Sequence, residues 1–153
     1  MLFRSGEPWV EDETNEDLVN PRNRVRHRVL PELDLAAGGP TRGTIARAAG
    51  LIREDGEWLD RLAGERFEAL TDPAPTGLEF DAAALTAEPA PVVRRLLLRA
   101  LRQVAWSRVI GLDHVEAVMA VLAGENGGVD VPGSRVELRR GKLVLIQRKG
   151  VAK

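Results

Sequence analysis

Residues 91–107 have the sequence "PVVRRLLLRALRQVAWS". Its apolar residues recur with the period of an α-helix. Pro91 suits the first position of a helix, where no hydrogen bond is lost through its missing N–H. The stretch therefore predicts a helix packed on a core. The residues expected to face that core are Val93, Leu97, Ala100, Leu101 and Val104.

The opposite face of this predicted helix is basic. Arg95, Arg99 and Arg102 follow one another at spacings of four and three residues, which places them on one side. A basic stripe of this kind is typical of a surface that contacts nucleic-acid phosphates. A solvated helix face has the same composition, so both interpretations stay open.

The segments that follow predict a second helix and a small sheet. Asp113 and Glu116 have the spacing of a capping box, and Gly124 suits the end of that helix. Beyond the second helix the apolar period falls to two, which predicts a short strand and then a hairpin with strands at 135–139 and 142–147. No aromatic residue interrupts this basic hairpin, so stacking on bases is not expected there.

The segments before residue 91 are mostly helical in pattern. One long helix is expected over residues 44–70, with a break near Gly56, and residues 71–77 are expected to be a linker. A further helix is expected from Arg24, kinked or interrupted at Pro31. We therefore expect a mainly α fold of the α+β class, with a small C-terminal β-hairpin element.

Composition excludes several classes of site. The chain has no cysteine, so it has no disulfide, thiolate metal site or cysteine nucleophile. With two histidines, a histidine-rich metal site is not expected either. No apolar run approaches the ~18 residues of a membrane span, and no signal-peptide pattern is present. We expect a cytoplasmic, soluble protein without a membrane partner.

Charge is divided unevenly along the chain, although the net charge is only −1. Residues 1–91 contain 10 Lys and Arg against 18 Asp and Glu, whereas residues 92–153 contain 12 against 5. The basic second half favours an anionic partner, of which nucleic acid is the most common.

A second concentration of positive charge lies in "RNRVRHR", residues 22–28, which we call the arginine segment. Guanidinium groups bind phosphates in bidentate fashion, and Asn23 is suited to capping a helix or reading a base edge. The alternative is that these arginines pair with nearby carboxylates. Those carboxylates are Glu11, Asp12, Glu13, Glu16 and Asp17.

No catalytic motif accompanies these basic segments. The chain has no Gly-rich phosphate loop after a strand and no persuasive Ser/His/Asp grouping, and His114 fits a structural role at a helix start. The residues alone therefore predict a binding module.

The arginine segment also carries a resemblance to a known family. "WVEDETN" (9–15) and "RNRVRHRVLPEL" (22–33) resemble the segment of tRNA(Ile)-lysidine synthetases that follows their ATP-binding domain. That family shows an Asp, a Ser/Thr-Asn, an Arg-Asn-x-aliphatic-Arg and a Leu-Pro-x-Leu. The residue after the Asp is often proline in the family and is Glu13 here. The matching positions are Asp12, Thr14-Asn15, Arg22-Asn23, Val25-Arg26 and Leu30-Pro31-Glu32-Leu33.

Three later stretches match the family's helical substrate-binding region and basic strands in the same order. They are "VVRRLLLRALRQV" (92–104), "GLDHVEAVMAVLAG" (111–124) and "VPGSRVELRRGKLVL" (131–145). The resemblance thus covers nearly the whole chain. It implies three parts, namely the tail of a PP-loop catalytic domain with a linker (1–23), a helical linker region (24–73) and a tRNA-binding substrate domain of two helices and a small β element (74–153).

The resemblance implies a ligase that modifies tRNA. Such enzymes use ATP to adenylate the C2 oxygen of the wobble cytidine in isoleucine tRNA with a CAU anticodon, and L-lysine then attacks C2 as AMP leaves. The Ser-Gly-Gly-x-Asp-Ser loop that binds ATP in this family does not occur here. We therefore expect ATP and Mg²⁺ to bind in an absent N-terminal domain, and this chain alone to bind no cofactor and to be inactive.

The resemblance also implies roles for individual residues. Arg22, Asn23 and Arg26 would lie near the active site in supporting roles, and a further set would bind tRNA. The second set comprises Arg24, Arg28, Arg95, Arg99, Arg102, Arg135, Arg139, Arg140 and Lys142. Expected partners are the tRNA, L-lysine and a PP-loop domain in cis or in trans, and a homodimer is left open.

Two other functions compete with this one. A free-standing helical scaffold that binds RNA or protein without catalysis would explain the same charge pattern. A tRNA-thiolating enzyme of the same ATP-binding superfamily is disfavoured, because such enzymes commonly use cysteines and this chain has none.

Overall fold

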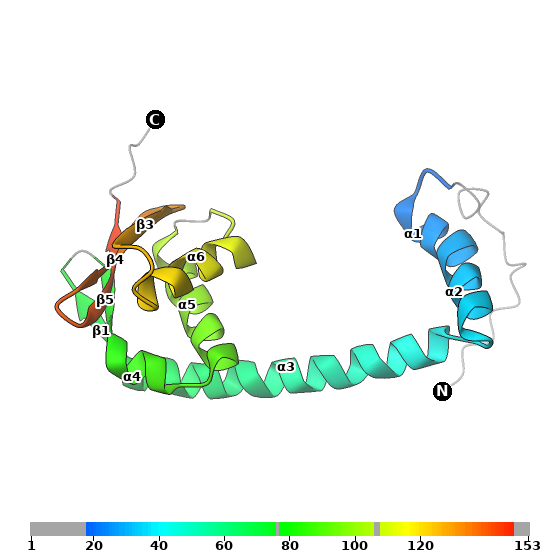
Figure 1. Ribbon diagram of the computed structural model, residues 1–153, viewed down its shortest axis with the longest axis horizontal. Coiled ribbons are helices and arrows are strands. Elements are labelled where there is room, and N and C mark those ends of the chain that lie inside the picture. Colours follow the sequence, from blue (N-terminus) through cyan, green and yellow to red (C-terminus); the bar gives the residue numbers. More distant parts are fainter. Residues whose placement is uncertain (1–17, 76, 106–107, 149–153) are drawn as a thin grey trace, which may run out of the picture. The chain divides into compact units, whose positions relative to one another are not determined.

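The computed structural model describes residues 18–75, 77–105 and 108–148. The chain divides into two compact units, Met1–Arg53 (unit 1) and Glu54–Lys153 (unit 2). The division falls inside one long helix, α3 (Arg42–Leu70), which appears in cyan to green in Figure 1.

The described part of unit 1 contains a continuous helical run near its start. The run comprises α1 (Pro21–Arg24), the π-helical turn η2 (Val25–Val29) and α2 (Leu30–Ala37). Asn20 is the N-cap of α1, and its side chain accepts a hydrogen bond from the backbone N–H of Arg22 at 3.0 Å. Capping by Asn23 was one of two sequence-based alternatives, and the structure assigns this role to Asn20.

The π turn is explained by Pro31. A proline in a helix has no N–H to donate, and its ring clashes with the carbonyl four residues earlier. The turn before it widens, and the N–H of Leu30 bonds to the carbonyl of Val25, five residues back. The distortion expected at Pro31 is therefore a π turn within a helix that continues through it.

A short loop connects α2 to α3. Gly38 has φ +68° and ends α2 in the left-handed conformation that glycine adopts without strain. The carboxylate of Asp34 then accepts hydrogen bonds from the backbone N–H of Thr41 (2.6 Å) and from its hydroxyl (2.5 Å). The loop is thereby held at both ends, and α3 starts two residues earlier than expected.

Helix α3 runs unbroken for 29 residues, so the expected break near Gly56 is wrong. Its expected apolar stripe is buried only in part. Ala63 and Phe67 are buried, whereas Ile52 and Trp58 are 71% and 56% exposed. The helix therefore has a core-facing end in unit 2 and an apolar face toward solvent before it.

Unit 2 contains a five-stranded antiparallel sheet with the strand order β1-β2-β5-β4-β3. The strands are β1 (Thr71–Ala74), β2 (Gly77–Asp81), β3 (Gly128–Val131), β4 (Ser134–Arg139) and β5 (Lys142–Gln147). The expected 135–139 and 142–147 hairpin is confirmed as β4 and β5. The expected fold class, mainly α and α+β, is confirmed as well.

The expected linker at 71–77 is wrong, because its first part forms β1. Pro73 removes a backbone donor, but β1 is an edge strand, where one missing donor is tolerated. The residues of β1 are typical of turns, so the sequence pattern did not indicate a strand here. The sheet is therefore larger than the C-terminal element that the sequence predicted.

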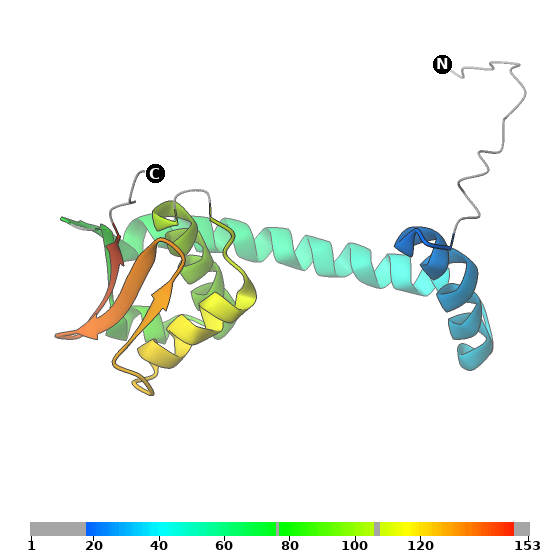
Figure 2. The ribbon, with the colours of Figure 1, turned by 90° about the horizontal axis from the view of Figure 1, so that it is seen from above.

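Three helices complete unit 2. They are α4 (Ala82–Ala87), α5 (Ala90–Val104) and α6 (Leu112–Leu122). Figure 2 shows α5 and α6 on the same side of the sheet. Their apolar faces pack on strand residues such as Phe80, Val136 and Leu143, all fully buried. The core-facing residues predicted for α5 are all buried.

The start of α6 differs from the expected capping box. The helix begins at Leu112, and the backbone N–H of Gly111 donates to Nδ1 of His114 at 3.0 Å. His114 thus has the structural role expected of it, while Glu116 pairs with Arg94 on α5. No helix within the described residues is long and apolar enough to cross a membrane.

Candidate nucleic-acid interface

The arginine segment lies on the first helical run of unit 1. Arg22 and Arg24 belong to α1, and Arg26 and Arg28 belong to η2. All four side chains are exposed. Arg22 and Arg26 are four residues apart, a spacing that keeps two side chains on one side of a helix. The fold therefore presents a concentrated positive charge to solvent.

Two members of the segment have structural roles. The guanidinium of Arg24 donates to the backbone carbonyl of Leu18 at 3.2 Å and to that of Val19 at 3.4 Å. It therefore holds the chain that enters α1. Asn23 is buried, with 8% of its surface exposed, so it contacts protein rather than solvent. The free cations of the segment are accordingly found at the other arginine positions.

Residues 18–53 contain seven arginines and only two carboxylates, Glu32 and Asp34. Thr41 donates hydrogen bonds to the Asp34 carboxylate, and the one from the Thr41 hydroxyl lowers the pKa of Asp34. Within the described residues, Arg22, Arg26 and Arg28 have no ion-pair partner. The carboxylates proposed to neutralise them, Glu11, Asp12, Glu13, Glu16 and Asp17, lie outside the described residues, as does the "WVEDETN" block.

The basic hairpin of unit 2 has a different environment. Glu137 lies between Arg135 and Arg139 on the solvent face of β4 and forms an ion pair with each. Arg135 also donates to Asp130 at 3.1 Å, and Asp130 pairs with Arg148. These arginines are therefore largely neutralised by their own sheet.

The pKa values of the carboxylates reflect this pairing. Hydrogen bonds from Arg135 lower the pKa of Glu137 and of Asp130. Glu79 raises the pKa of Lys142 through a direct hydrogen bond across β2 and β5. Exposed pairs of this kind add little stability. Their main effect is to reduce the positive charge that the sheet offers to an anion.

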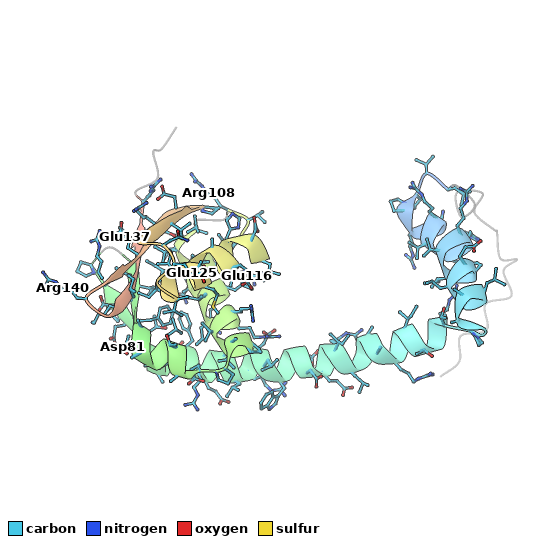
Figure 3. All side chains as sticks on the ribbon, in the orientation of Figure 1. Asp81, Arg108, Glu116, Glu125, Glu137 and Arg140 are labelled. Carbon is cyan, nitrogen blue, oxygen red and sulfur yellow. The ribbon has the colours of Figure 1, made fainter. Side chains whose placement is uncertain are left out.

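Arg140 differs from the other basic hairpin residues. It lies in the turn between β4 and β5, with φ +49°, and its side chain is exposed. Figure 3 shows it extending away from the sheet, whereas Glu137 lies along β4. Arg140 has no ion-pair partner within the described residues. It is therefore a hairpin cation available to a phosphate.

The basic stripe of α5 meets the last turns of α3. Arg95 donates to the carboxylate of Asp60 at 2.7 Å and to the carbonyl of Pro91 at 3.1 Å. The guanidinium of Arg99 lies 5.1 Å from the centroid of the Phe67 ring. Arg102 is exposed and has no partner within the described residues.

These side chains line a hollow of about 590 Å³ between α3 and α5, which we call the α3–α5 groove. Apart from Arg95, the lining residues that matter for its chemistry are Asp60, Ala63, Gly64, Arg99, Arg102 and Gln103. All of them belong to unit 2. The groove brings together the three arginines of the predicted stripe. Asp60 and Gln103 line it beside them.

Sequence reasoning missed the acids that neutralise the predicted tRNA contacts. Glu137 could have been found, because it alternates with Arg135 and Arg139 on one strand face. Asp60 could not, because it lies 35 residues before Arg95 and only the packing of α3 on α5 joins them. Gln103 was missed because an exposed amide has no pattern of its own.

A cofactor site for ATP and Mg²⁺ does not fit the described residues. They contain no group of three Asp, Glu or His side chains that could hold a metal ion. The glycines at 38 and 39 follow a helix rather than a strand, so they do not form a phosphate-binding loop. No chemical step is therefore assigned to ATP within these residues.

Comparison with known proteins identifies the relatives of this chain. It is 34% identical over 145 residues to the tRNA(Ile)-lysidine synthase of Cutibacterium acnes, a match that covers 93% of this chain. It is 35% identical over 144 residues to that of Streptomyces coelicolor (92% of this chain) and 25% identical over 154 residues to that of a Nostoc species (92% of this chain). No family model matches the chain.

The matches cover only part of each relative. The aligned regions span 42%, 40% and 45% of these three proteins, so the chain spans less than half their length. The resemblance seen in the arginine segment is thus confirmed over nearly the whole of this chain.

Proposed function

We propose that this chain, a relative of tRNA(Ile)-lysidine synthases over more than nine-tenths of its length, is the C-terminal, tRNA-binding portion of such an enzyme. The observation that carries the proposal is the 34% identity over 145 residues to a protein of that name. The exposed and unpaired arginines of both units support it, because folded RNA is bound mainly through its phosphates. The proposed setting is the cytoplasm.

In this proposal the two units have different roles. Arg22 and Arg26 hold phosphates close to the wobble cytidine, and Asn23, being buried, positions the helix that carries them. Arg24 fixes the chain before α1, and Arg28 adds a further phosphate contact. Guanidinium groups suit this task because they bind phosphate oxygens in bidentate geometry and stay charged at any physiological pH.

Unit 2 would bind the tRNA at a distance from the reacting base. Arg99, Arg102 and Arg140 are its leading candidates, because their guanidinium groups pair with no carboxylate of the described residues. Arg95, Arg135, Arg139 and Lys142 remain candidates, but each must first exchange a carboxylate partner for a phosphate. The parts 1–23, 24–73 and 74–153 remain our proposed division of domains.

The remaining components belong to the proposed whole enzyme. A PP-loop domain, acting in cis or in trans, would bind ATP and Mg²⁺, and ATP would supply the adenylyl group that activates C2 of the cytidine. L-lysine would be the second substrate. The residues of this chain orient the anticodon region and contribute positive charge beside it. A homodimer is compatible with this arrangement.

A chimeric enzyme tests the proposal. The corresponding 145 residues of the Cutibacterium acnes relative are replaced by those of this chain, and lysidine in an unmodified CAU-anticodon tRNA(Ile) transcript is measured by mass spectrometry. We expect the chimera to form lysidine, and the same chimera with Arg26→Ala to form much less. A chimera that folds and binds ATP but forms no lysidine, beside an active parent, contradicts the proposal.

One observation favours a second function, a scaffold that binds protein. Within unit 1, helix α3 exposes the neighbouring side chains of Leu51 and Ile52, and exposed large apolar side chains often mark a protein interface. Such a complex would change little with salt, whereas RNA binding weakens steeply as salt rises. Binding that is insensitive to salt would therefore favour the scaffold.

A further inference from the structure

The α3–α5 groove has a floor made of small residues. Ala63 and Gly64 lie on the side of α3 that faces α5. A Cβ atom placed on Gly64 would lie 3.5 Å from Nη1 of Arg99, which is ordinary van der Waals contact, so that guanidinium lies directly beside the helix. The groove is thus open at its centre and positively charged at its wall.

The three arginines of the groove are not equivalent. Arg95 has a carboxylate partner, because it donates to Asp60 and also to the carbonyl of Pro91. The ring of Phe67 supports Arg99, and a cation over a ring keeps the N–H groups at its edge free to donate. Arg102 has no partner within the described residues. Two guanidinium groups are thus ready to bind an anion.

The remaining lining residues indicate the class of anion. Among the described residues no aromatic side chain lines the groove, so these residues offer no surface on which a base would stack. The amide of Gln103, which is exposed beside Arg102, both donates and accepts hydrogen bonds. A phosphate with a neighbouring hydroxyl, as in the 2′-OH of a ribose, matches this set of groups.

We propose that the α3–α5 groove is a binding site for one phosphodiester of an RNA backbone, contacted by Arg99 and Arg102. Asp60 limits the affinity of this site, because its carboxylate repels the phosphate and holds Arg95 away from it. The inference rests on the proposed function, since the tRNA supplies the backbone. It goes further by assigning a defined site and an acid that weakens it.

Two substitutions with opposite expected effects test this inference. The full chain is titrated against a fluorescently labelled CAU-anticodon tRNA(Ile) transcript, with anisotropy measured at several salt concentrations. Arg102→Ala should weaken binding about tenfold at low salt and lower the slope of log K against log salt by about one. Asp60→Asn should strengthen binding several-fold, because it removes a negative charge and releases Arg95.

Each substitution has a matched control on the same helix. Arg94→Ala removes an arginine of α5 that pairs with Glu116 outside the groove, and Asp55→Asn removes an exposed acid of α3 that does not line it. Both should leave the affinity within about twofold of the parent. Asp60→Asn nearly preserves the size of its side chain and Arg102 is exposed, so neither change threatens folding. Circular dichroism verifies this.

The outcomes separate this inference from the proposed function. If the parent chain does not bind the tRNA, the proposed function fails and the phosphodiester site fails with it. If the parent binds but Arg102→Ala behaves like Arg94→Ala, the site is refuted while the proposed function stands. If Asp60→Asn binds no better than Asp55→Asn, the role assigned to Asp60 is refuted.

Discussion

The ring of Phe67 on α3 meets the ring of Phe80 on β2 edge to face, with centroids 6.0 Å apart and planes at 78°. Both side chains are buried, with 4% and 0% of their surfaces exposed. An edge-to-face pair is favourable because the positive edge of one ring meets the negative face of the other. This contact attaches the end of the long helix to the sheet. The Phe67 ring also contacts the guanidinium of Arg99.

Phe67→Ala should therefore destabilise unit 2 markedly. Removing a buried phenylalanine lowers the free energy of unfolding by about 3–5 kcal/mol, through lost burial and a cavity. Urea denaturation followed by circular dichroism measures this loss. Trp58→Ala, an exposed aromatic on the same helix, is the control and should change stability by less than about 0.5 kcal/mol. Equal losses in the two variants would contradict the packing described.

Gly77→Ala should disrupt the start of β2. Gly77 has φ +153°, and a Cβ atom there would overlap the carbonyl oxygen of Leu145 on β5. Relief of the overlap requires the backbone to shift, so we expect a loss of at least about 1–3 kcal/mol in thermal or urea unfolding. Gly127→Ala, where no atom lies within 4 Å, is the matched control. A stable Gly77→Ala protein would show that this register is wrong.

Much of unit 2 is predictable from the sequence because its elements are periodic. The helical spacing of α5 and the alternation of Leu143 and Leu145 in β5 each report which face is buried, whereas Leu138 of β4 is 37% exposed. By contrast, β1 is short, contains Pro73 and resembles a turn. It becomes a strand because β2 supplies its hydrogen-bond partners, which no local pattern reports.

The candidate site was predictable to a smaller extent. The positions of the arginines follow from the sequence. Whether a given arginine pairs with a carboxylate does not. Glu137 neutralises Arg139, whereas Arg140, the next residue, is left unpaired by the turn that places it. That distinction depends on strand register and on contacts between distant segments. It is therefore a property of the fold.

The pKa of Asp34 offers a test of the loop between α2 and α3. Hydrogen bonds from Thr41 lower this pKa below the ordinary value of an aspartate, so they favour the charged carboxylate in the folded state. The resulting stability is present above the unfolded pKa and is lost as the pH falls through the lowered folded pKa. Thr41→Val should raise the Asp34 pKa measured by NMR titration.

The same substitution should also flatten the acid dependence of stability. The melting temperature of the parent should fall as the pH drops below about 4, and that of Thr41→Val should fall less steeply. Thr44→Val, which removes a hydroxyl bonded to Arg47 instead, should leave the Asp34 titration unchanged. An unchanged Asp34 titration in Thr41→Val would refute the hydrogen bonds as its cause.

Substitutions in the arginine segment and in the β4–β5 hairpin should affect catalysis and tRNA binding to different extents. Arg26→Ala should reduce lysidine formation by the chimeric enzyme more than it reduces tRNA binding, because we place Arg26 near the reacting base. Joint Arg139→Ala and Arg140→Ala substitution should do the reverse. Parallel measurements of lysidine by mass spectrometry and of tRNA affinity distinguish them. Proportional losses in both assays for both variants would refute this division of roles.

Within the hairpin, Arg140 should matter more than Arg139. Arg140→Ala removes an unpaired cation and should lower the salt dependence of tRNA binding by about one phosphate contact. Arg139→Ala removes an arginine that already pairs with Glu137, so its effect should be smaller. The two single variants control for each other in the same titration. A larger effect at Arg139 would show that its ion pair opens in the complex.

The proposed function requires this chain to bind isoleucine tRNA, and a gel-shift titration measures that binding. The chain is titrated against unmodified CAU-anticodon tRNA(Ile) at about 50 and 200 mM salt, with elongator methionine tRNA, which has the same anticodon, as competitor. We expect preferential binding of the isoleucine tRNA, and we expect this binding to weaken steeply at the higher salt. Absence of binding at low salt, or binding that salt does not change, would contradict the proposed function.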